Sequence, residues 1–156
     1  MDKTSTIQHH TFVIDRRYAH PPEKVFSGFS DPKKKRRWMG GDDDGWTIEK
    51  FDMNFEVGGA ESWRFRFQGG PVMGNEVRYL DIVPGRRIVI AYTMDTEGKR
   101  FSSSQQTIEL LPDAGGTRLL LTEQIAFLDG SDSVQSREHG TRELLDALDK
   151  ELGLVR

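Results

Sequence analysis

One carboxylate in this sequence lies where a carboxylate is energetically costly. Glu123 falls within a predicted strand, 116–127, and alternate residues of a strand share one face. An ionised carboxylate on an apolar face costs free energy unless it is paired, protonated or hydrated. We therefore predict that Glu123 is a candidate acid or base for a catalysed reaction. The residues that share its face are Leu119, Leu121, Ile125 and Phe127.

Arg16 is the candidate partner of this carboxylate. It lies between Ile14 and Tyr18 on one face of a predicted first strand, 7–18, and its guanidinium could pair with Glu123. Three other arrangements remain open. The carboxylate could lie in water near the mouth of a cavity, a one-residue slip could turn it outward, or it could form an inward ion pair that only orders the core.

Aromatic and methionine side chains on the predicted strands could line a binding site, because such side chains adapt to apolar ligands on a concave sheet. Packing against one another is the alternative for each of them. A polar run in one strand, 102–106, could supply hydrogen bonds to the same ligand or could form an exposed edge. The candidate lining residues are Trp63, Phe65, Tyr79, Tyr92, Met94, Phe101 and Phe127.

The sequence contains no pattern typical of a metal, nucleotide or nucleophile site. Its histidines, His9, His10, His20 and His139, have neither the i, i+4 spacing nor the HExxH motif of zinc sites. The consecutive aspartates 42–44 lack the alternate spacing of a calcium loop. The glycine-rich motifs of nucleotide-binding proteins and the GxSxG motif of serine hydrolases are absent. We expect no metal and no cofactor.

Composition indicates one soluble domain. The chain has 156 residues, no cysteine and a net charge of -3, which does not favour a nucleic-acid partner. The basic run Lys33–Arg37 is interpreted as the solvated face of a short helix, partly balanced by the aspartates 42–44. No apolar run approaches the roughly 20 residues that span a bilayer, and no signal peptide is visible. We therefore expect a cytoplasmic protein that does not bind membranes.

The longest periodic segment, 133–152, is predicted to be the helix that closes the core. Asp132 is its predicted N-cap. The N-terminal half of its apolar stripe is thin, because Thr141 stands beside Arg137 where larger apolar residues would be needed. We therefore expect a cavity between that half and a curved sheet. The stripe, at three-to-four spacing, is Val134, Thr141, Leu144, Leu145, Leu148 and Leu152.

The rest of the chain is predicted to form strands, apart from two short helices, 23–29 and 31–38, after the first strand. Connections between the later strands are too short for crossover helices, so neighbouring strands must be antiparallel. The predicted fold is α+β, a curved antiparallel sheet of six to seven strands wrapped around the C-terminal helix. It forms a single domain, 1–156, with a core of about 7–153. The later strands are predicted at 46–57, 60–68, 72–83, 86–95, 100–111 and 116–127.

Several turn and packing segments recur in the order known from one superfamily. They are His20-Pro21-Pro22-Glu23-Lys24-Val25-Phe26, Asp31-Pro32, Trp38, Val57-Gly58-Gly59, Pro84-Gly85-Arg86-Arg87-Ile88-Val89 and Gly115-Gly116-Thr117-Arg118-Leu119. Over residues 12–152 the chain resembles the SRPBCC (START-like, helix-grip) superfamily. Within it, the chain is most similar to the branch named after the C-terminal domain of the activator of the heat-shock-protein ATPase. The resemblance implies a helix-grip domain that holds an apolar or amphipathic small molecule.

The chain departs from this family at three places. The family usually has alanine at the position of His20, and an acidic and a basic residue at those of Asn54 and Glu56. It usually has a Gly-Trp pair in the last helix, where this chain has Gly140-Thr141. Replacing a large indole by threonine on the side that faces the sheet should enlarge or reshape the cavity. Thr141 and Leu144 are therefore added to the candidate ligand-binding residues.

Three classes of function agree with these observations, because a fold does not determine a function. The first is a small-molecule-binding domain that encloses a hydrophobic or aromatic ligand between the sheet and the last helix. The second is an enzyme of the cyclase, dehydratase or hydrolase type that uses Glu123 as acid or base. The third is a module that binds a chaperone or a regulatory protein. The sequence identifies neither the ligand nor the oligomeric state.

Overall fold

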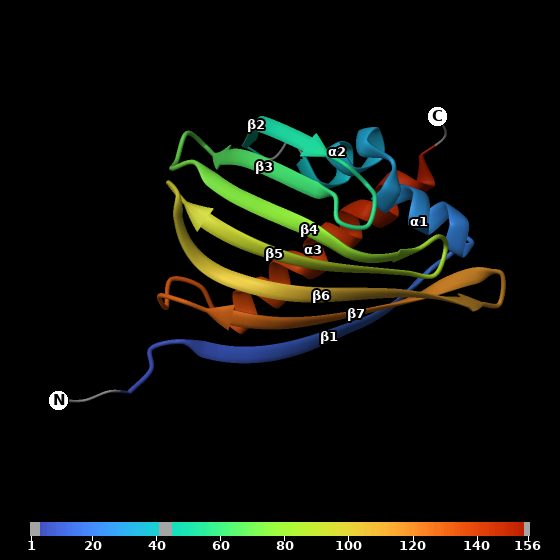
Figure 1. Ribbon diagram of the computed structural model, residues 1–156. Coiled ribbons are helices and arrows are strands. Elements are labelled where there is room, and N and C mark those ends of the chain that lie inside the picture. The colour runs from blue at the N-terminus through green and yellow to red at the C-terminus, as the bar shows by residue number, and fades with distance from the viewer. Residues whose placement is uncertain (1–3, 41–44, 155–156) are drawn as a thin grey trace.

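The computed structural model in Figure 1 describes residues 4–40 and 45–154, so the aspartates 42–44 lie outside the described residues. Two short helices follow the first strand and a long helix ends the chain, in the predicted order. Element boundaries differ from the prediction by a few residues, most at β2. The elements are β1 (Gln8–Tyr18), α1 (Pro22–Ser30), α2 (Pro32–Gly40), β2 (Trp46–Met53), β3 (Ala60–Phe67), β4 (Met73–Val83), β5 (Arg87–Thr96), β6 (Lys99–Asp113), β7 (Gly116–Phe127) and α3 (Val134–Gly153).

The seven strands form one antiparallel sheet in the order β1-β7-β6-β5-β4-β3-β2. The sheet curves around α3, which crosses its concave face diagonally, while α1 and α2 lie near the C-terminal end of α3 (Figure 1). This arrangement confirms the predicted α+β fold. β1 and β2 are the two edge strands, although only β2 interrupts its pairing, with a register shift between Ile48 and Lys50.

Close contacts between the helices hold the C-terminal half of α3 in place. A Cβ atom on Gly28 of α1 would lie 2.5 Å from a methyl carbon of Leu148, so a larger residue at this position would displace that side chain. The indole N–H of Trp38 donates to the carbonyl of Gly28 at 2.8 Å and links α2 to α1. On the other side, the buried hydroxyl of Tyr18 donates to the Leu145 carbonyl and ties β1 to α3.

The apolar stripe of α3 is divided as the sequence predicts. Leu145, Leu148 and Leu152 are at most 2% exposed and belong to the main core. In the N-terminal half the buried residues are Arg137 and Thr141 instead. The core therefore ends part-way along α3, and polar groups occupy the space beyond it.

The N-terminus of α3 corrects the predicted cap. Ser133, rather than Asp132, is the N-cap, and its side-chain oxygen accepts a hydrogen bond from the N–H of Ser136. The Asp132 carboxylate accepts from the Ser133 N–H at 2.8 Å and from Arg137 at 3.1 Å. An acidic residue at this position is thus used to hold an arginine that points into the protein.

The basic run 33–37 agrees only in part with its interpretation as a solvated helix face, because Lys33, Arg36 and Arg37 are exposed but Lys35 is buried. Lys35 is 6% exposed, and its ammonium donates to Glu61 at 2.7 Å. Arg37 donates to Glu151 of α3 at 2.7 Å. The physical reason is the helical period, because Lys35 lies three residues before the buried Trp38 and therefore on the same side of α2.

Candidate functional site

Glu123 faces the interior of the sheet and is fully buried. The registers of β7 with β1 and with β6 run without a shift, so the strand does not turn the side chain outward. Its Oε2 atom accepts hydrogen bonds from the Tyr92 hydroxyl at 2.6 Å and from the Ser104 hydroxyl at 3.1 Å. Its Oε1 atom accepts one from the Gln106 amide at 2.8 Å. The polar run on β6 therefore contributes inward donors to this carboxylate.

The charged partner of Glu123 is Arg137, from the first turn of α3. One terminal nitrogen of Arg137 lies 3.2 Å from Glu123 Oε2, and the other donates to Ser102 at 2.7 Å. The guanidinium also lies over the rings of Tyr92 and Phe127, at 5.8 and 5.6 Å from their centroids. Arg137 thus fills part of the space beneath the thin half of α3. We call these groups, with Gln106, Ser104 and Asp132, the arginine cluster.

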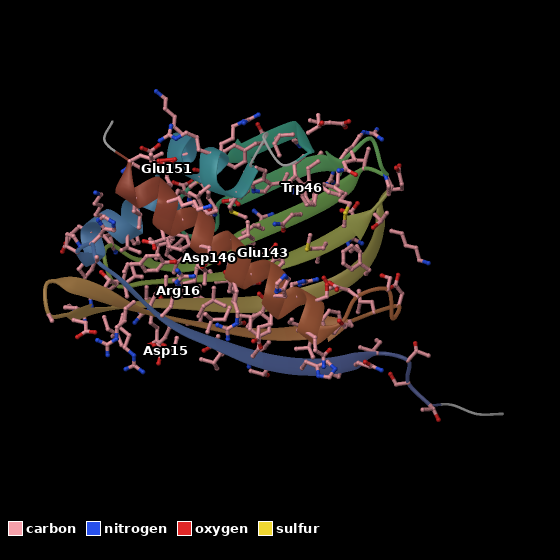
Figure 2. The ribbon with its side chains drawn as sticks, turned by 180° about the vertical axis from the view of Figure 1, so that it is seen from behind. Asp15, Arg16, Trp46, Glu143, Asp146 and Glu151 are labelled. Carbon is pink, nitrogen blue, oxygen red and sulfur yellow. The ribbon has the colours of Figure 1, made fainter. Side chains whose placement is uncertain are left out.

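The predicted pair of Glu123 with Arg16 is wrong. Arg16 donates to Asp146 of α3 at 2.7 Å, and the two residues face each other across the edge of the sheet (Figure 2). In the β1–β7 register Arg16 lies opposite Leu119, four residues from Glu123. Four residues of a strand span about 13 Å, which is too far for an ion pair. Catalytic roles for Glu123 and Arg16 stay predictions.

Arg137 was missed although the sequence carried a signal for it. It lies three residues after Val134 and four before Thr141, so the helical period places it on the stripe that faces the sheet. A charged residue on such a stripe needs a buried partner of opposite charge, and Glu123 is the carboxylate on an apolar strand face. Arg137 and Glu123, the two charged residues on faces that are otherwise apolar, could therefore have been predicted to pair.

Burial and the neighbouring charges set the protonation states in this cluster. Burial raises the pKa of Tyr92, and the negative charge of Glu123 raises it further, so the hydroxyl stays protonated and donates. Burial opposes the charge of Arg137, but Tyr92, Glu123 and Asp132 raise its pKa overall. The cluster is therefore a satisfied ion pair with neutral donors around it.

A second buried cluster lies on the concave face, where Lys35 of α2 reaches residues of β3 and β4. Lys35 donates to Glu61, which also accepts from the Trp63 indole at 2.8 Å and from the Tyr79 hydroxyl. All four side chains are buried. Burial opposes ionisation of Glu61, but the charge of Lys35 and the three hydrogen bonds outweigh it and lower its pKa. We call this the lysine cluster.

The structure distributes the predicted lining residues over different environments. Trp63 and Tyr79 belong to the lysine cluster, whereas Tyr92 and Phe127 belong to the arginine cluster. Phe101 is buried in the sheet. The remaining four are assigned as follows: Thr141 is buried and donates to the Arg137 carbonyl, Leu144 packs half-buried against the core, and Phe65 and Met94 are partly exposed on the concave face.

Phe65 lies in an aromatic group on the part of the concave face that none of the described helices covers. In Figure 2 α3 crosses the sheet, and the ends of β3, β4 and β5 near Trp46 have no helix in front of them. The ring of Trp46 contacts Phe65 and Phe67, with centroids 5.5 and 4.8 Å away. Trp46 and Phe67 are 37% and 44% exposed, so this group, the aromatic patch, presents apolar surface to solvent.

Asn75 lies on the same face of the sheet and is not satisfied. It lies opposite Trp63 on β3 and Met94 on β5. The buried Val77 is two residues further along β4, on the same face of the sheet. Its side-chain oxygen is shielded from water and has no hydrogen-bond partner. A buried acceptor without a donor costs about 1–3 kcal/mol, so this position is a candidate contact for a ligand.

The described surface includes two hollows beside β1. One, of about 610 Å³, lies on the outer face of the sheet and is lined by His9, Thr11, Ser103, Gln105 and Gln124, among others. The other, of about 530 Å³, lies between β1 and the N-terminal half of α3. Within residues 4–40 and 45–154, no three histidine, aspartate or glutamate side chains come together as metal ligands. None of the described helices is long and apolar enough to cross a membrane.

The family model named "Activator of Hsp90 ATPase homolog 1-like protein" matches residues 19–153. The chain belongs to this family. The match covers both buried clusters and every helix, and it agrees with the resemblance noted in the sequence. Domains of this family and fold generally bind ligands or have regulatory roles. A comparison with curated proteins gave no match.

Solved structures support the same assignment. The protein Mll3558 from Rhizobium loti is 44% identical, with a TM-score of 0.87, and the alignment covers 94% of this chain and 99% of that one. An uncharacterised protein from Rhizobium leguminosarum is 34% identical, with a TM-score of 0.89 and coverage of 94% and 96%. CalU16 from Micromonospora echinospora shares the fold, at 22% identity and a TM-score of 0.61, with coverage of 96% and 85%.

Proposed function

We propose that the chain binds a small aromatic molecule that carries a hydrogen-bond donor, on the uncovered end of the concave face. The observation that carries this proposal is the unpartnered oxygen of Asn75, a half-buried residue beside an otherwise apolar surface. Because that oxygen is shielded from water, a turn of the amide would have to bring it to a ligand O–H or N–H, while the ring would pack on the aromatic patch of Trp46, Phe65 and Phe67. Met94, opposite Asn75 on β5, would contact the same ring.

The arginine cluster supports a binding role in preference to catalysis by Glu123. Both carboxylate oxygens of Glu123 accept hydrogen bonds from protein groups, and Arg137 is paired with it. A general acid or base needs a position from which it can reach the proton of a substrate. In this fold the cluster instead fixes α3 over the sheet and so defines one side of the proposed binding surface.

Two matched probes test the proposal, 2-naphthol and 2-methoxynaphthalene, which share a ring system but differ in the donor. We expect the protein to bind 2-naphthol about fivefold more tightly, because one neutral hydrogen bond contributes about 1 kcal/mol. Asn75→Leu should abolish this preference and raise the melting temperature of the unliganded protein, since it removes an unsatisfied buried acceptor. Equal binding of the two probes by the unmodified protein would refute the role of Asn75.

Gln105→Leu is the matched control, because Gln105 is exposed on the outer face of the sheet. It should leave the preference for 2-naphthol unchanged. Native mass spectrometry of the purified protein, followed by extraction under denaturing conditions, would then identify any natural ligand. Recovery of a purely aliphatic compound would contradict the proposed ligand class.

A further inference from the structure

We propose that the edge strand β1 pairs antiparallel with β1 of a second copy of this chain, with the two-fold axis at Val13. The sheet would then continue through fourteen strands in a closed dimer. Such an interface is isologous, because each copy presents the same strand to the other. This proposal does not depend on the ligand proposed above.

The two edges of the sheet differ in how they are protected. Natural sheets protect their edges with short strands, charged side chains, prolines, bulges or covering elements. β2 has 8 residues and a register shift between Ile48 and Lys50. β1 has 11 residues without proline, its register with β7 is continuous, and its charged residues Asp15, Arg16 and Arg17 are each paired within the same chain. In Figure 1 β1 forms the lower border of the sheet, with no described element beyond it.

The backbone of β1 presents hydrogen-bonding groups at regular intervals along this edge. Leu128 directly follows β7, and its N–H donates to the carbonyl of Phe101 in β6. The backbone groups of Leu128 therefore point to β6. Because backbone groups alternate in direction along a strand, the groups of Phe127 and every second residue before it point to β1. Phe127 pairs with Gln8, so the odd-numbered residues of β1 direct their N–H and C=O groups to the free edge.

A register centred on Val13 pairs all eleven residues of both strands. Val13 is 53% exposed, and on the axis it would contact the partner's Val13 and bury apolar surface. Thr11 would lie opposite the partner's Asp15, and His9 opposite the partner's Arg17. No two carboxylates and no two arginines face each other in this register, so no two permanently charged groups of like sign oppose it.

The space beside this edge is open on the concave side. The hollow of about 530 Å³ between β1 and α3 is lined by Thr11 and Phe12 on one side and by Val134, Glu138 and Arg142, among others, on the other. α3 therefore does not cover the edge of the strand. A pair of strands about 35 Å long makes a small interface, so we expect a dimer of micromolar affinity.

The first test is the mass of the protein in solution between about 1 and 100 μM, by light scattering and analytical ultracentrifugation. We expect a concentration-dependent dimer. Val13→Lys places two like charges on the axis and should weaken dimerisation at least about tenfold. The control Val57→Lys alters another exposed valine, away from the edge, and should leave dimerisation unchanged. A monomer over the whole concentration range would overturn the proposal.

The second test uses the absence of cysteine from the sequence, so that one introduced thiol is unique. In Val13→Cys the two thiols would lie across the axis, with Cα atoms about 5.5 Å apart. A short bis-methanethiosulfonate reagent should join them into a covalent dimer. In Thr11→Cys the two thiols would lie four residues apart along the strands, about 13 Å, and should not be joined. Equal cross-linking of the two variants would refute this register and the proposal with it.

Discussion

The two buried clusters neutralise a buried carboxylate in different ways. In the lysine cluster a single ammonium meets Glu61, which also accepts from Tyr79 and Trp63, and all of these groups are sealed from solvent. In the arginine cluster the guanidinium of Arg137 is divided among two carboxylates and several hydroxyls. The first is compact, whereas the second is wider and gives Glu123 three neutral donors.

The two clusters also differ in how far they lie from solvent. The lysine cluster lies under α2, where the side chain of Glu61 is 1% exposed. The arginine cluster lies at the N-terminus of α3 and includes Asp132, whose side chain is 19% exposed. Water can therefore reach the margin of the arginine cluster when a partner is lost. We conclude that the lysine cluster depends more strongly on each of its members.

The largest expected effect is that of Lys35→Met. Removing the cation leaves Glu61 buried with only neutral donors, and breaking a buried pair costs about 3–5 kcal/mol. Arg137→Met should cost less, about 2–3 kcal/mol, because Glu123 keeps three neutral donors and Asp132 can be hydrated. Urea unfolding of the two variants measures both free energies of unfolding.

A double variant provides the control for this comparison. Lys35→Met combined with Glu61→Leu replaces both charges by apolar groups, and such replacements are often close to neutral. It should regain most of the stability lost in Lys35→Met. A loss in Arg137→Met as large as that in Lys35→Met would contradict the proposed difference between the clusters.

Removing one tyrosine hydroxyl from each cluster compares the two clusters again, with a smaller expected loss of stability. Tyr92→Phe removes a donor to Glu123, which keeps the Ser104 hydroxyl, the Gln106 amide and Arg137 as donors. Tyr79→Phe removes a donor to Glu61, which keeps Lys35 and the Trp63 indole. We expect losses of about 1 kcal/mol for Tyr92→Phe and about 2 kcal/mol for Tyr79→Phe. Equal losses on thermal and urea unfolding would show that the number of remaining donors does not decide the cost.

Much of the fold could be predicted from the sequence because its signals are local. Alternating apolar residues and glycine or proline turns locate the strands, and the three-to-four leucine spacing locates α3. The inward position of Glu123 follows from the same alternation. These features depend on residues that are close together in the chain, so they can be predicted without knowing which residues of neighbouring strands are paired.

The partners within the site could not be predicted in the same way. Pairing Glu123 with Arg137 depends on how α3 lies across the sheet, and the choice between Arg16 and Arg137 depends on a shift of four residues along β1 and β7. Lys35 and Glu61 meet only because the tertiary packing brings α2 and β3 within reach of each other's side chains. The helical or strand period indicates that each of these charged residues faces inward. The distance between two such residues depends on how their helices and strands pack together.

Acid unfolding gives the smallest effect and the most specific test of the lysine cluster. The pKa of Glu61 is lowered in the folded state, because Lys35 and the hydrogen bonds outweigh the cost of burial. A lowered pKa adds stability above the unfolded value of about 4.3, and this contribution is lost as the pH falls through the folded pKa. The free energy of unfolding should therefore decrease below about pH 4.3, by at most about 1.4 kcal/mol per pH unit from this one group. Glu61→Gln lacks the titrating group, and Lys35→Met lacks the charge that lowers the pKa, so both should unfold with a flatter acid dependence than the unmodified protein. If all three proteins lost stability in parallel between pH 5 and pH 3, the acid dependence would arise outside the lysine cluster.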